Sequence, residues 1–464
     1  MSELFLSSDL KIETIDSNFD VAIEGCAHGE LEIIYDLITF VNTEKSRNVK
    51  LLLCCGDFQS VRNNSRDLDS MAVPPKFRRL NSFYQYYEGI KKAPCLTIFI
   101  GGNHEASEYL WELPYGGWVA PMIFYMGWAN VVNFVYEYSP FEKGNWHQII
   151  IRIAGISGIY KKQDYNIGHF ERPPLNEDTK RSIYHIRNLD VYRLSLLDTS
   201  INPINICLSH DWPSGIWNYG DVDRLLTIKP YFQKDIQSGQ LGSPPTNELL
   251  KKLKPDYWFS AHLHVKFAAL FPHKSYSKNN KESSLDDEDD TTIKETFTKF
   301  LALDKCLPHR QFLQVISFPH SVKDIEISAK SDSPDNDNDL ATSSLDNGKF
   351  KTRSYLAYDL EWIDVLRKTD SLVNCDKTRT NIPYALEEPL LSQQPDDLKK
   401  VRSTITPIAF PSSNLFVPTT KNSPATINIQ TLEFCQKFNL INLYDELKPP
   451  ENETLENVDK YFDF

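Results

Sequence analysis

Five apolar runs in this chain each end in a cluster of polar residues, and this recurring unit limits the fold more than any other feature of the sequence. Each run has the length and composition of a buried strand. Because ligand sites in α/β folds gather at the carboxyl ends of strands, we expect the five clusters to meet in space. The clusters are Cys26 with His28, Asp57, Asn103 with His104 and Glu105, Ser209 with His210 and Asp211, and His262 with His264.

Helical patterns separate some of these strands. Residues 30–41 place Leu31, Ile34 and Ile38 at helical spacing, and residues 246–253 follow the Pro244-Pro245 pair, which is typical of a helix start. Strand, helix, strand repeats predict an α/β (α+β) fold in which helices cover the outer faces of the sheets. The chain has 464 residues, 41% of them hydrophobic, which is enough to form such cores.

The formal net charge of −13 at first argues against a nucleic-acid partner, because the negatively charged phosphates favour a basic protein surface. However, residues 285–290 and residues 331–348 each contain five acids and no base, so the rest of the chain is nearly balanced. The eight cysteines lack the spacing of a disulfide framework, and the first residues lack the pattern of a signal peptide. We therefore expect reduced thiols and a cytosolic or nuclear protein.

The stretch 113–136 is uncharged and long enough to cross a bilayer. Pro114, Pro121 and several Gly and Asn residues interrupt it, which favours turns and short strands over a membrane helix. We expect no membrane association.

The clusters offer one thiol, one carboxylate, one carboxamide and four imidazoles as metal ligands. This set suits one or two ions of Fe(II), Zn or Mn rather than Ca or Mg. On a strand, His262 and His264 would point to the same side, and the same spacing relates Cys26 to His28. Asp57, with two oxygens, is the natural bridge between two ions. Any one cluster alone is weak evidence, since a buried His more often satisfies the core.

A site of this composition keeps excess positive charge, which favours hydrolysis of a phosphate ester. His104 follows the candidate ligand Asn103 directly, and it is our candidate general acid for the departing oxygen. A purely structural hydrogen bond is the alternative role for His104. A Ser209-His210-Asp211 triad is excluded, because consecutive residues at a strand end diverge.

The Gly56-Asp57 pair, GNHE at 102–105, a single His after a strand and a final His-x-His resemble the calcineurin-like metallophosphoesterases. That resemblance implies a four-layer α/β/β/α sandwich of two mixed sheets, here with a C-terminal extension. Two departures, Cys26 in place of the usual first Asp and SAHLH at 260–264, are similar to the RNA lariat debranching enzymes. So are GDFQSVRN at 56–63 and LPYGGWVAP at 113–121. This likeness covers residues 21–310, with a fainter continuation at 358–366.

The resemblance implies hydrolysis of the 2',5'-phosphodiester at the branch point of excised intron lariats, which gives linear intron RNA. It implies His104 as the acid and seven metal ligands, which are Cys26, His28, Asp57, Asn103, His210, His262 and His264. A thiol is a softer and less reliably charged ligand than Asp, so one of the two ions, held by His28, Asp57 and His264, is expected to bind weakly or not at all. The stronger pocket is then expected at Asp57, Asn103, His210 and His262. A Cys26 thiolate near metal and solvent would also be sensitive to oxidation.

Residues 155–187 interleave aromatic and basic side chains, as single-stranded RNA binding requires, and an ordinary solvated loop is the alternative. The segment resembles the lariat recognition loop of the family, which we assign to about residues 143–187. The expected RNA contacts are Tyr160, Lys161, Lys162, Tyr165, His169, Phe170 and Arg172.

The chain is expected to divide around a catalytic domain at 18–274. The other expected parts are an N-terminal extension at 1–17, acidic disordered insertions at 275–295 and 328–348, a debranching-enzyme segment at 296–327 that packs on the sheet, and a C-terminal segment and tail at 349–464 with a helix at 431–447.

Branched intron lariat RNA is the expected partner, and splicing-associated proteins are candidates for the C-terminal segment. We expect a monomer located in the nucleus and also in the cytoplasm. Two other functions stay open. One is a protein or nucleotide phosphatase of the same superfamily, and the other is a non-catalytic scaffold with this fold, although the complete set of ligand types argues against a scaffold.

Overall fold

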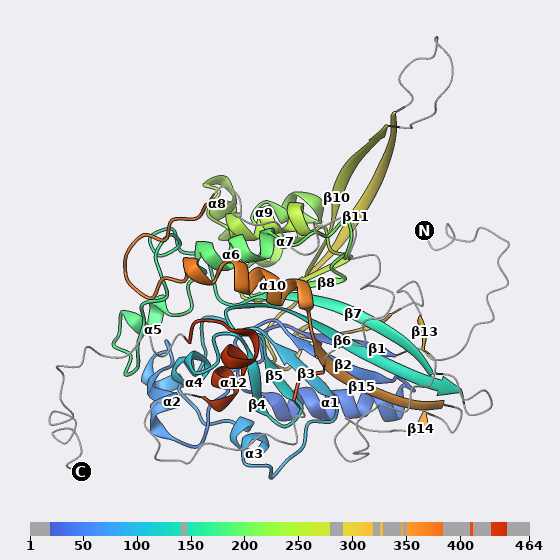
Figure 1. Cartoon of the computed structure of the whole chain (residues 1–464), viewed down its shortest axis with the longest axis horizontal. Coiled ribbons are helices and arrows are strands. Elements are labelled where there is room, and N and C mark those ends of the chain that lie inside the picture. The colour runs from blue at the N-terminus through green and yellow to red at the C-terminus, as the bar shows by residue number, and fades with distance from the viewer. Residues whose placement is uncertain are drawn as a thin grey trace.

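Two mixed β-sheets stack face to face, and helices cover the outer side of each (Figure 1). The computed structural model describes residues 19–140, 146–278, 291–318, 325–327, 345–346, 350–383, 409–411 and 428–442. The predicted N-terminal extension at 1–17 lies outside these ranges. Within them, the predicted four-layer α/β/β/α sandwich is confirmed.

The first sheet contains six strands, and its central strands run parallel. The strand from the C-terminal half of the chain, β12, pairs antiparallel with β1 and so covers that edge. In spatial order the strands are β12 (Leu313–Ser317), β1 (Asp20–Glu24), β2 (Val49–Cys54), β3 (Leu96–Phe99), β5 (Ile123–Tyr125) and β4 (Gly117–Ala120).

The second sheet contains nine strands, of which β13 (Ile325–Ile327) pairs with the start of β7. Strands β7, β8, β9 and β11 run parallel to one another, and the outer pairs are antiparallel. In spatial order the other strands are β10 (Phe267–Lys278), β11 (Thr291–Ala302), β9 (Tyr257–Ser260), β8 (Ile206–Ser209), β7 (Trp146–Ile156), β6 (Ala129–Pro140), β15 (Phe350–Tyr358) and β14 (Leu345–Asp346).

Strand residues alternate between two hydrophobic cores, as a period of two requires. Val21 and Ile23 lie in the core between the sheets, whereas Ala22 lies in the core beneath α1 (Leu31–Glu44). The adjacent Cys54 and Cys55 separate in the same way. This alternation fixes the register, because a slip of one residue would exchange the two buried faces.

The helices on the first sheet bury apolar residues against its outer face, and the predicted helix at 30–41 is α1, with Leu31, Ile34 and Ile38 buried. The other helices on this side are α2 (Ser65–Asp69), α3 (Phe83–Tyr87) and α4 (Ser107–Trp111), with a short 3-10 helix at Pro75–Phe77.

The second sheet is covered by helices that share one core. The predicted helix at 246–253 begins earlier, at Pro244, where the Ser243 hydroxyl accepts a hydrogen bond from the backbone N–H of Thr246, a cap worth about 1 kcal/mol. The helices on this side are α6 (Asn188–Ser195), α7 (Val222–Ile228), α8 (Phe232–Gln237), α9 (Pro244–Leu253) and α10 (Leu360–Lys368), with 3-10 helices at Ile216–Tyr219 and Asp370–Leu372.

The uncharged stretch at 113–136 forms β4, β5 and the start of β6, as its Pro and Gly residues predict. None of the helices in the described ranges has both the length and the apolar character needed to span a membrane.

The described residues 350–383 and 428–442 of the C-terminal segment pack on the sandwich. Asp359 caps α10 by accepting from the N–H of Trp362, and its carboxylate also accepts two hydrogen bonds of 2.8 Å from Arg152 on β7. Breaking a buried pair of this kind costs about 3–5 kcal/mol, so α10 is firmly held to the second sheet. The predicted helix at 431–447 is α12 (Ile429–Phe438), which ends where Asn439 adopts a left-handed conformation. A short α5 (Thr179–Ser182) lies in the predicted recognition loop.

The first acidic insertion is shorter than we predicted. Strands β10 and β11 form a long hairpin that projects from the body (Figure 1), and their pairing continues from Lys274 with Glu295 to Lys278 with Thr291. Residues 275–278 and 291–295 are therefore strand, and residues 279–290 lie outside the described ranges. Composition misled here because backbone hydrogen bonds form the ladder whatever the side chains are. In the second insertion, Leu345–Asp346 is strand as well.

Candidate metal centre

The strand ends bring all seven predicted ligands together from distant parts of the sequence. Strands β1, β2 and β3 end beside one another in the first sheet, and β8 and β9 do so in the second. The loops that follow these strands carry the polar clusters. They form two groups that meet at Asp57.

The first group consists of Cys26, His28, Asp57 and His264, with ligand atoms that all lie within 4.8 Å of one another. The Nε2 atoms of His28 and His264 are 3.3 Å apart, and Nε2 of His28 lies 3.6 Å from Oδ2 of Asp57. The side-chain amide of Gln59 lies 3.3 Å from Nδ1 of His28 and so orients this ring. Converging imidazole nitrogens, a thiol and a carboxylate are a donor set for a transition metal.

The second group consists of His210, Asn103 and His262. The backbone carbonyl of Cys55 accepts a hydrogen bond of 2.7 Å from Nδ1 of His210, which leaves Nε2 without a proton. That Nε2 atom lies 3.1 Å from Oδ1 of Asn103 and 3.4 Å from Oδ1 of Asp57. The ring centres of His210 and His262 are 5.0 Å apart. Burial lowers the pKa of both histidines to about 4, so both are neutral, as metal ligands must be.

Asp57 lies between the two groups, with one oxygen toward each. Oδ1 accepts hydrogen bonds of 2.9 Å from the backbone N–H groups of Asn103 and His104. Oδ2 is buried and has no hydrogen-bond partner among the described residues. Burial alone would raise the pKa of Asp57, but His210 and the neighbouring imidazoles bring it below its usual value. A buried, charged oxygen without a donor fits a cation, so the residues present suit a metal at this position.

Four of the seven predicted ligands have a left-handed backbone, which corrects the expectation that strand spacing points His262 and His264 to the same side. The φ angles are 48° for His28, 49° for Asp57, 59° for His262 and 50° for His264, and these residues follow the strands rather than lie on them. As a result His264 joins the first group while His262 joins the second. Such conformations cost about 1–3 kcal/mol each and concentrate at functional sites.

Glu105 holds the two ligand loops together, although its sequence position gave it no predicted role. Its carboxylate accepts hydrogen bonds of 2.7–2.8 Å from the backbone N–H groups of Phe58, Gln59 and Gly102. It therefore links the loop that carries Asp57 to the loop that carries Asn103. The sequence feature that could have indicated this role is the position of Glu105, a charged residue that directly follows GNH at the end of a buried strand.

Glycine is required at position 102 by close approach. A Cβ atom there would collide with the side chain and backbone of Asp57 and press on the His210 ring. The absence of a side chain lets the loop pass close to both ligands.

The Cys26 thiol is buried, so the condition on which its oxidation sensitivity was predicted, a position near solvent, is not met. Its exposed fraction is 0%, and Sγ accepts a hydrogen bond of 3.2 Å from the backbone N–H of His262. Burial, with the nearby carboxylates, raises the pKa of the thiol well above its ordinary value. Because Sγ is not exposed to solvent, direct oxidation of Cys26 by solvent-borne agents is disfavoured in the folded protein.

Iodoacetamide is expected to modify half-buried Cys375 at least about tenfold faster than Cys26 in the native protein, because the Cys26 thiol is buried and the reagent cannot reach it. Peptide mass spectrometry after timed labelling measures both rates. In denaturant the two cysteines should react alike. Faster labelling of Cys26 in the native state would contradict the burial described here.

His104 lies at the edge of both groups. Its ring centre is 5.9 Å from that of His28, and its Nε2 atom lies 3.1 Å from Nδ2 of Asn103. Nδ1 has no hydrogen-bond partner among the described residues. This position is compatible with proton transfer to a group bound between the predicted ligands. The contact with Asn103 is also a hydrogen bond of the kind that the structural alternative for His104 requires.

Most of the predicted RNA contacts lie on the surface of the loop. Lys161 and Lys162 are exposed, and the half-buried ring of Tyr160 packs edge-on against that of Tyr165 at 5.4 Å. Phe170 and Arg172 are also half-buried. The loop leaves strand β7 beside the metal centre, where Gly158 donates a hydrogen bond to the carbonyl of Gly101.

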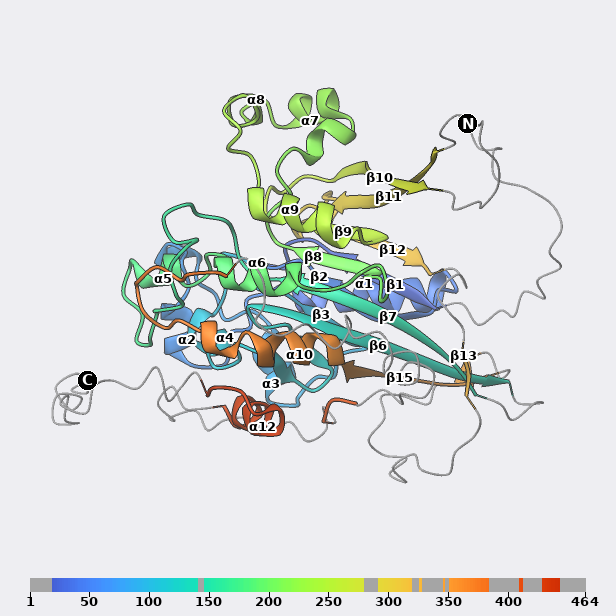
Figure 2. The same cartoon turned by 45° about the horizontal axis from the view of Figure 1, so that its top comes forward.

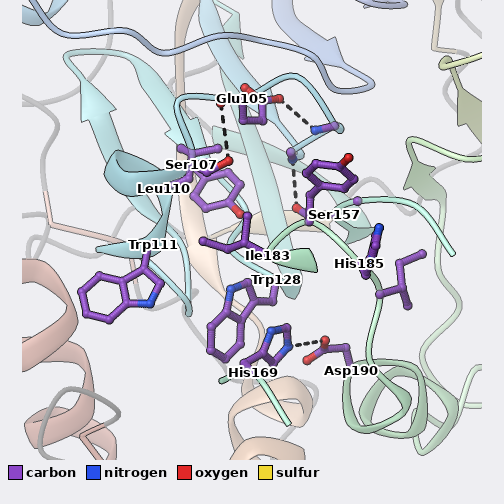
Figure 3. Close-up of a pocket in the computed structure, with 16 residues that line it drawn as sticks. Glu105, Ser107, Leu110, Trp111, Trp128, Ser157, His169, Ile183, His185 and Asp190 are labelled. Carbon is purple, nitrogen blue, oxygen red and sulfur yellow. Dashed lines mark hydrogen bonds and ion pairs between the residues drawn. The ribbon is translucent and has the colours of Figure 1, made fainter. Parts of the chain in front are cut away.

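His169 differs from the other loop residues, because it is buried in the support of the loop. Figure 3 shows its ring stacked on Trp128, at a centroid distance of 3.5 Å, with Nε2 2.9 Å from Asp190. The small cavity beside this stack has a volume of about 40 Å³, enough for a few water molecules. The structure thus gives His169 a supporting position in place of the predicted direct contact with RNA.

Comparisons with known proteins decide the family. The calcineurin-like phosphoesterase model matches residues 19–266, and the model for the lariat debranching enzyme C-terminal domain matches residues 295–443. The lariat debranching enzyme of Homo sapiens is 43% identical over 449 residues, which cover 93% of this chain and 71% of that protein. This chain belongs to the lariat debranching enzyme family.

Similarity to the family extends across kingdoms. Lariat debranching enzyme A of Xenopus laevis is 42% identical over 449 residues, covering 93% of this chain and 72% of that protein. The lariat debranching enzyme of Arabidopsis thaliana is 44% identical over 365 residues, covering 79% of this chain and 72% of that protein. The resemblance drawn from Cys26 and the surrounding motifs is confirmed, and membership in a metallophosphoesterase family implies use of a divalent metal.

Proposed function

We propose that this protein hydrolyses the 2',5'-phosphodiester bond at the branch point of excised intron lariat RNA and releases linear intron RNA. One or two ions of Fe(II), Zn or Mn would be held by the seven ligands described above. The observation that carries the proposal is the position of Asp57 between two ligand groups, in a chain similar over 93% of its length to proteins named lariat debranching enzymes.

A bound divalent ion would polarise the phosphate and lower the pKa of a coordinated water. The protein itself supplies neutral imidazoles at His210 and His262, so that most of the positive charge remains available to a phosphodiester. A hydrogen bond from the backbone N–H of Asn103 fixes the carboxylate of Asp57, and Oδ1 of Asn103 lies 3.1 Å from the unprotonated Nε2 of His210. His104 then donates a proton to the departing 2'-oxygen, which would otherwise leave as a poor alkoxide.

The recognition loop is proposed to hold the RNA around the branch point. Tyr160, Tyr165 and Phe170 offer aromatic faces for bases, while Lys161, Lys162 and Arg172 offer charges for phosphates. His169 does not contact the RNA in this proposal; its stack on Trp128 supports the recognition loop.

The rival function is that of a protein or nucleotide phosphatase, which would use similar metals. Incubating the metal-loaded protein with a branched 2',5'-linked RNA and with a phosphomonoester distinguishes the two. We expect release of the 2'-linked strand and little hydrolysis of the monoester. Preference for the monoester would overturn the debranching proposal, and absence of turnover on any phosphate ester would favour a scaffold.

Compartment and assembly follow from this substrate as proposals. Intron lariats are products of splicing, so we expect the protein in the nucleus, with a smaller share in the cytoplasm. The C-terminal segment is proposed to contact splicing-associated proteins, and the protein is expected to be a monomer. The domain division at 18–274 is likewise proposed, next to a match of the phosphoesterase model at 19–266. Imaging of a fluorescent fusion tests the nuclear location, and light scattering tests whether the protein is a monomer.

A further inference from the structure

A cavity of about 740 Å³ lies between the recognition loop and the segment that follows α10. This volume is within the roughly 300–1,000 Å³ typical of ligand sites. Positive side chains and aromatic rings line it together, a combination suited to single-stranded RNA. These residues are Lys161, Phe170, Arg181, Tyr184 and Lys377.

The C-terminal side of this cavity is docked on the loop through the backbone. In both views the orange segment after α10 runs beside the green loop that leads to α5 (Figure 1, Figure 2). Main-chain hydrogen bonds join residues 166–169 to residues 374–380. They run from Gly168 N to the carbonyls of Asp376 and Thr378 (3.1 and 3.3 Å), from His169 N to that of Asn374 (3.0 Å) and from Thr380 N to that of Asn166 (2.8 Å).

Gly168 makes this docking possible. A Cβ atom at position 168 would collide with the carbonyl oxygens of Asn374 and Asp376, which are backbone atoms and cannot move aside cheaply. The close approach of the two segments therefore depends on the absence of a side chain at this position.

The cavity also lies beside the metal centre. Ile159 and Tyr184, which both line it, are joined by a hydrogen bond of 3.0 Å from the backbone N–H of Ile159 to the carbonyl of Tyr184. The N–H of Gly158, the residue before Ile159, donates to the carbonyl of Gly101 on the loop that carries Asn103. The N–H of Tyr160, the residue after Ile159, lies 3.3 Å from Oδ2 of Asp211, which directly follows His210. Backbone contacts therefore place the cavity lining beside two of the loops that carry predicted ligands.

Cations in the cavity are available for phosphate. Within the described ranges, neither Arg181 nor Lys377 forms an ion pair, and the Nζ atom of Lys377 lies 5.1 Å from the ring centre of Phe170. Two carboxylates also line the cavity, Asp164 and Asp178, and the first accepts a hydrogen bond of 2.6 Å from His185. Three cations therefore face two acids, one of which is engaged.

We propose that the RNA strand attached to the scissile phosphate passes through this cavity, and that Lys377 and Arg181 contact its phosphates. Residues 374–380 are then part of the substrate site, joined to a loop about 200 residues earlier in the chain. The inference rests on the proposed function, because it assumes a branched RNA at the metal centre.

The test uses the full-length, metal-loaded protein and its Lys377→Glu variant. We expect KM for branched RNA to rise about fivefold or more, and the slope of log Kd against log salt to fall by about 0.7 for the lost phosphate contact. The Kd is measured with a branched RNA that carries a non-hydrolysable 2',5' linkage. Hydrolysis of bis(4-nitrophenyl) phosphate should not change, because this small diester does not reach the cavity.

Lys229→Glu is the matched control, since Lys229 also lies over an aromatic ring, that of Tyr231, at 5.9 Å on the remote α7–α8 connection. It should leave KM and the salt slope unchanged. A second variant, Gly168→Ala, should undock residues 374–380, which faster hydrogen exchange in both segments would report.

Equal KM and equal salt slope for Lys377→Glu and wild type would overturn the inference. If the wild-type protein hydrolyses the small diester but not branched RNA, the proposed function fails instead, and the non-hydrolysable RNA still measures whether Lys377 contributes to RNA binding.

Discussion

Replacing Asp57 with Asn is expected to lower kcat/KM for branched RNA by about 1,000-fold or more. Asn has nearly the same shape, but it lacks the charge that both ligand groups share. Oδ2 lies 3.6 Å from His28 and Oδ1 lies 3.4 Å from His210, so one substitution weakens both groups. Metal content, measured by plasma mass spectrometry, should fall together with activity.

Asp67→Asn separates loss of metal from loss of stability. Asp67 is also fully buried, but its carboxylate pairs with Arg62 at 2.9 Å rather than with histidines. This variant should lower the melting temperature and leave the metal content per folded molecule unchanged. If Asp57→Asn kept its metal and its activity, Asp57 would not be the shared ligand.

The positions of the ligands could be predicted from sequence because they depend on a local pattern. A buried strand followed by a polar cluster occurs five times, and parallel strands bring such ends together. The division of His264 and His262 between two pockets was predicted from the family resemblance and not from the spacing of strand residues. Alternation holds only in extended chain, whereas His262 and His264 have φ angles of 59° and 50° and turn toward different groups.

Long-range packing explains the other differences. His169 belongs by composition to an RNA-binding loop, but its environment comes from Trp128 and Asp190, which lie on other elements. Residues 374–380 dock on Gly168, about 200 residues earlier in the chain, through backbone hydrogen bonds. Because these bonds use main-chain atoms, no pattern of side chains in the sequence could predict them. Burial of Cys26 similarly depends on the loop that carries His262.

His104→Ala is expected to lower kcat for branched RNA by about 100- to 10,000-fold, the usual contribution of a general acid. Metal content and Kd for the non-hydrolysable branched RNA should stay near wild-type values. His104 contacts Asn103 through the amide nitrogen Nδ2, so its loss leaves the predicted ligand atom Oδ1 facing His210. Its backbone N–H, which binds Asp57, is kept in the variant.

The leaving group provides the sharper test of this role. A nitrophenolate leaves without a proton, so hydrolysis of bis(4-nitrophenyl) phosphate should fall much less than debranching in His104→Ala, since protonation of the departing oxygen matters only for a poor leaving group. His147→Ala, at the far end of β7, is the control for loss of an imidazole. Equal losses on both substrates would mean that His104 positions the metal centre and donates no proton, because a defect in the centre itself affects every phosphodiester alike.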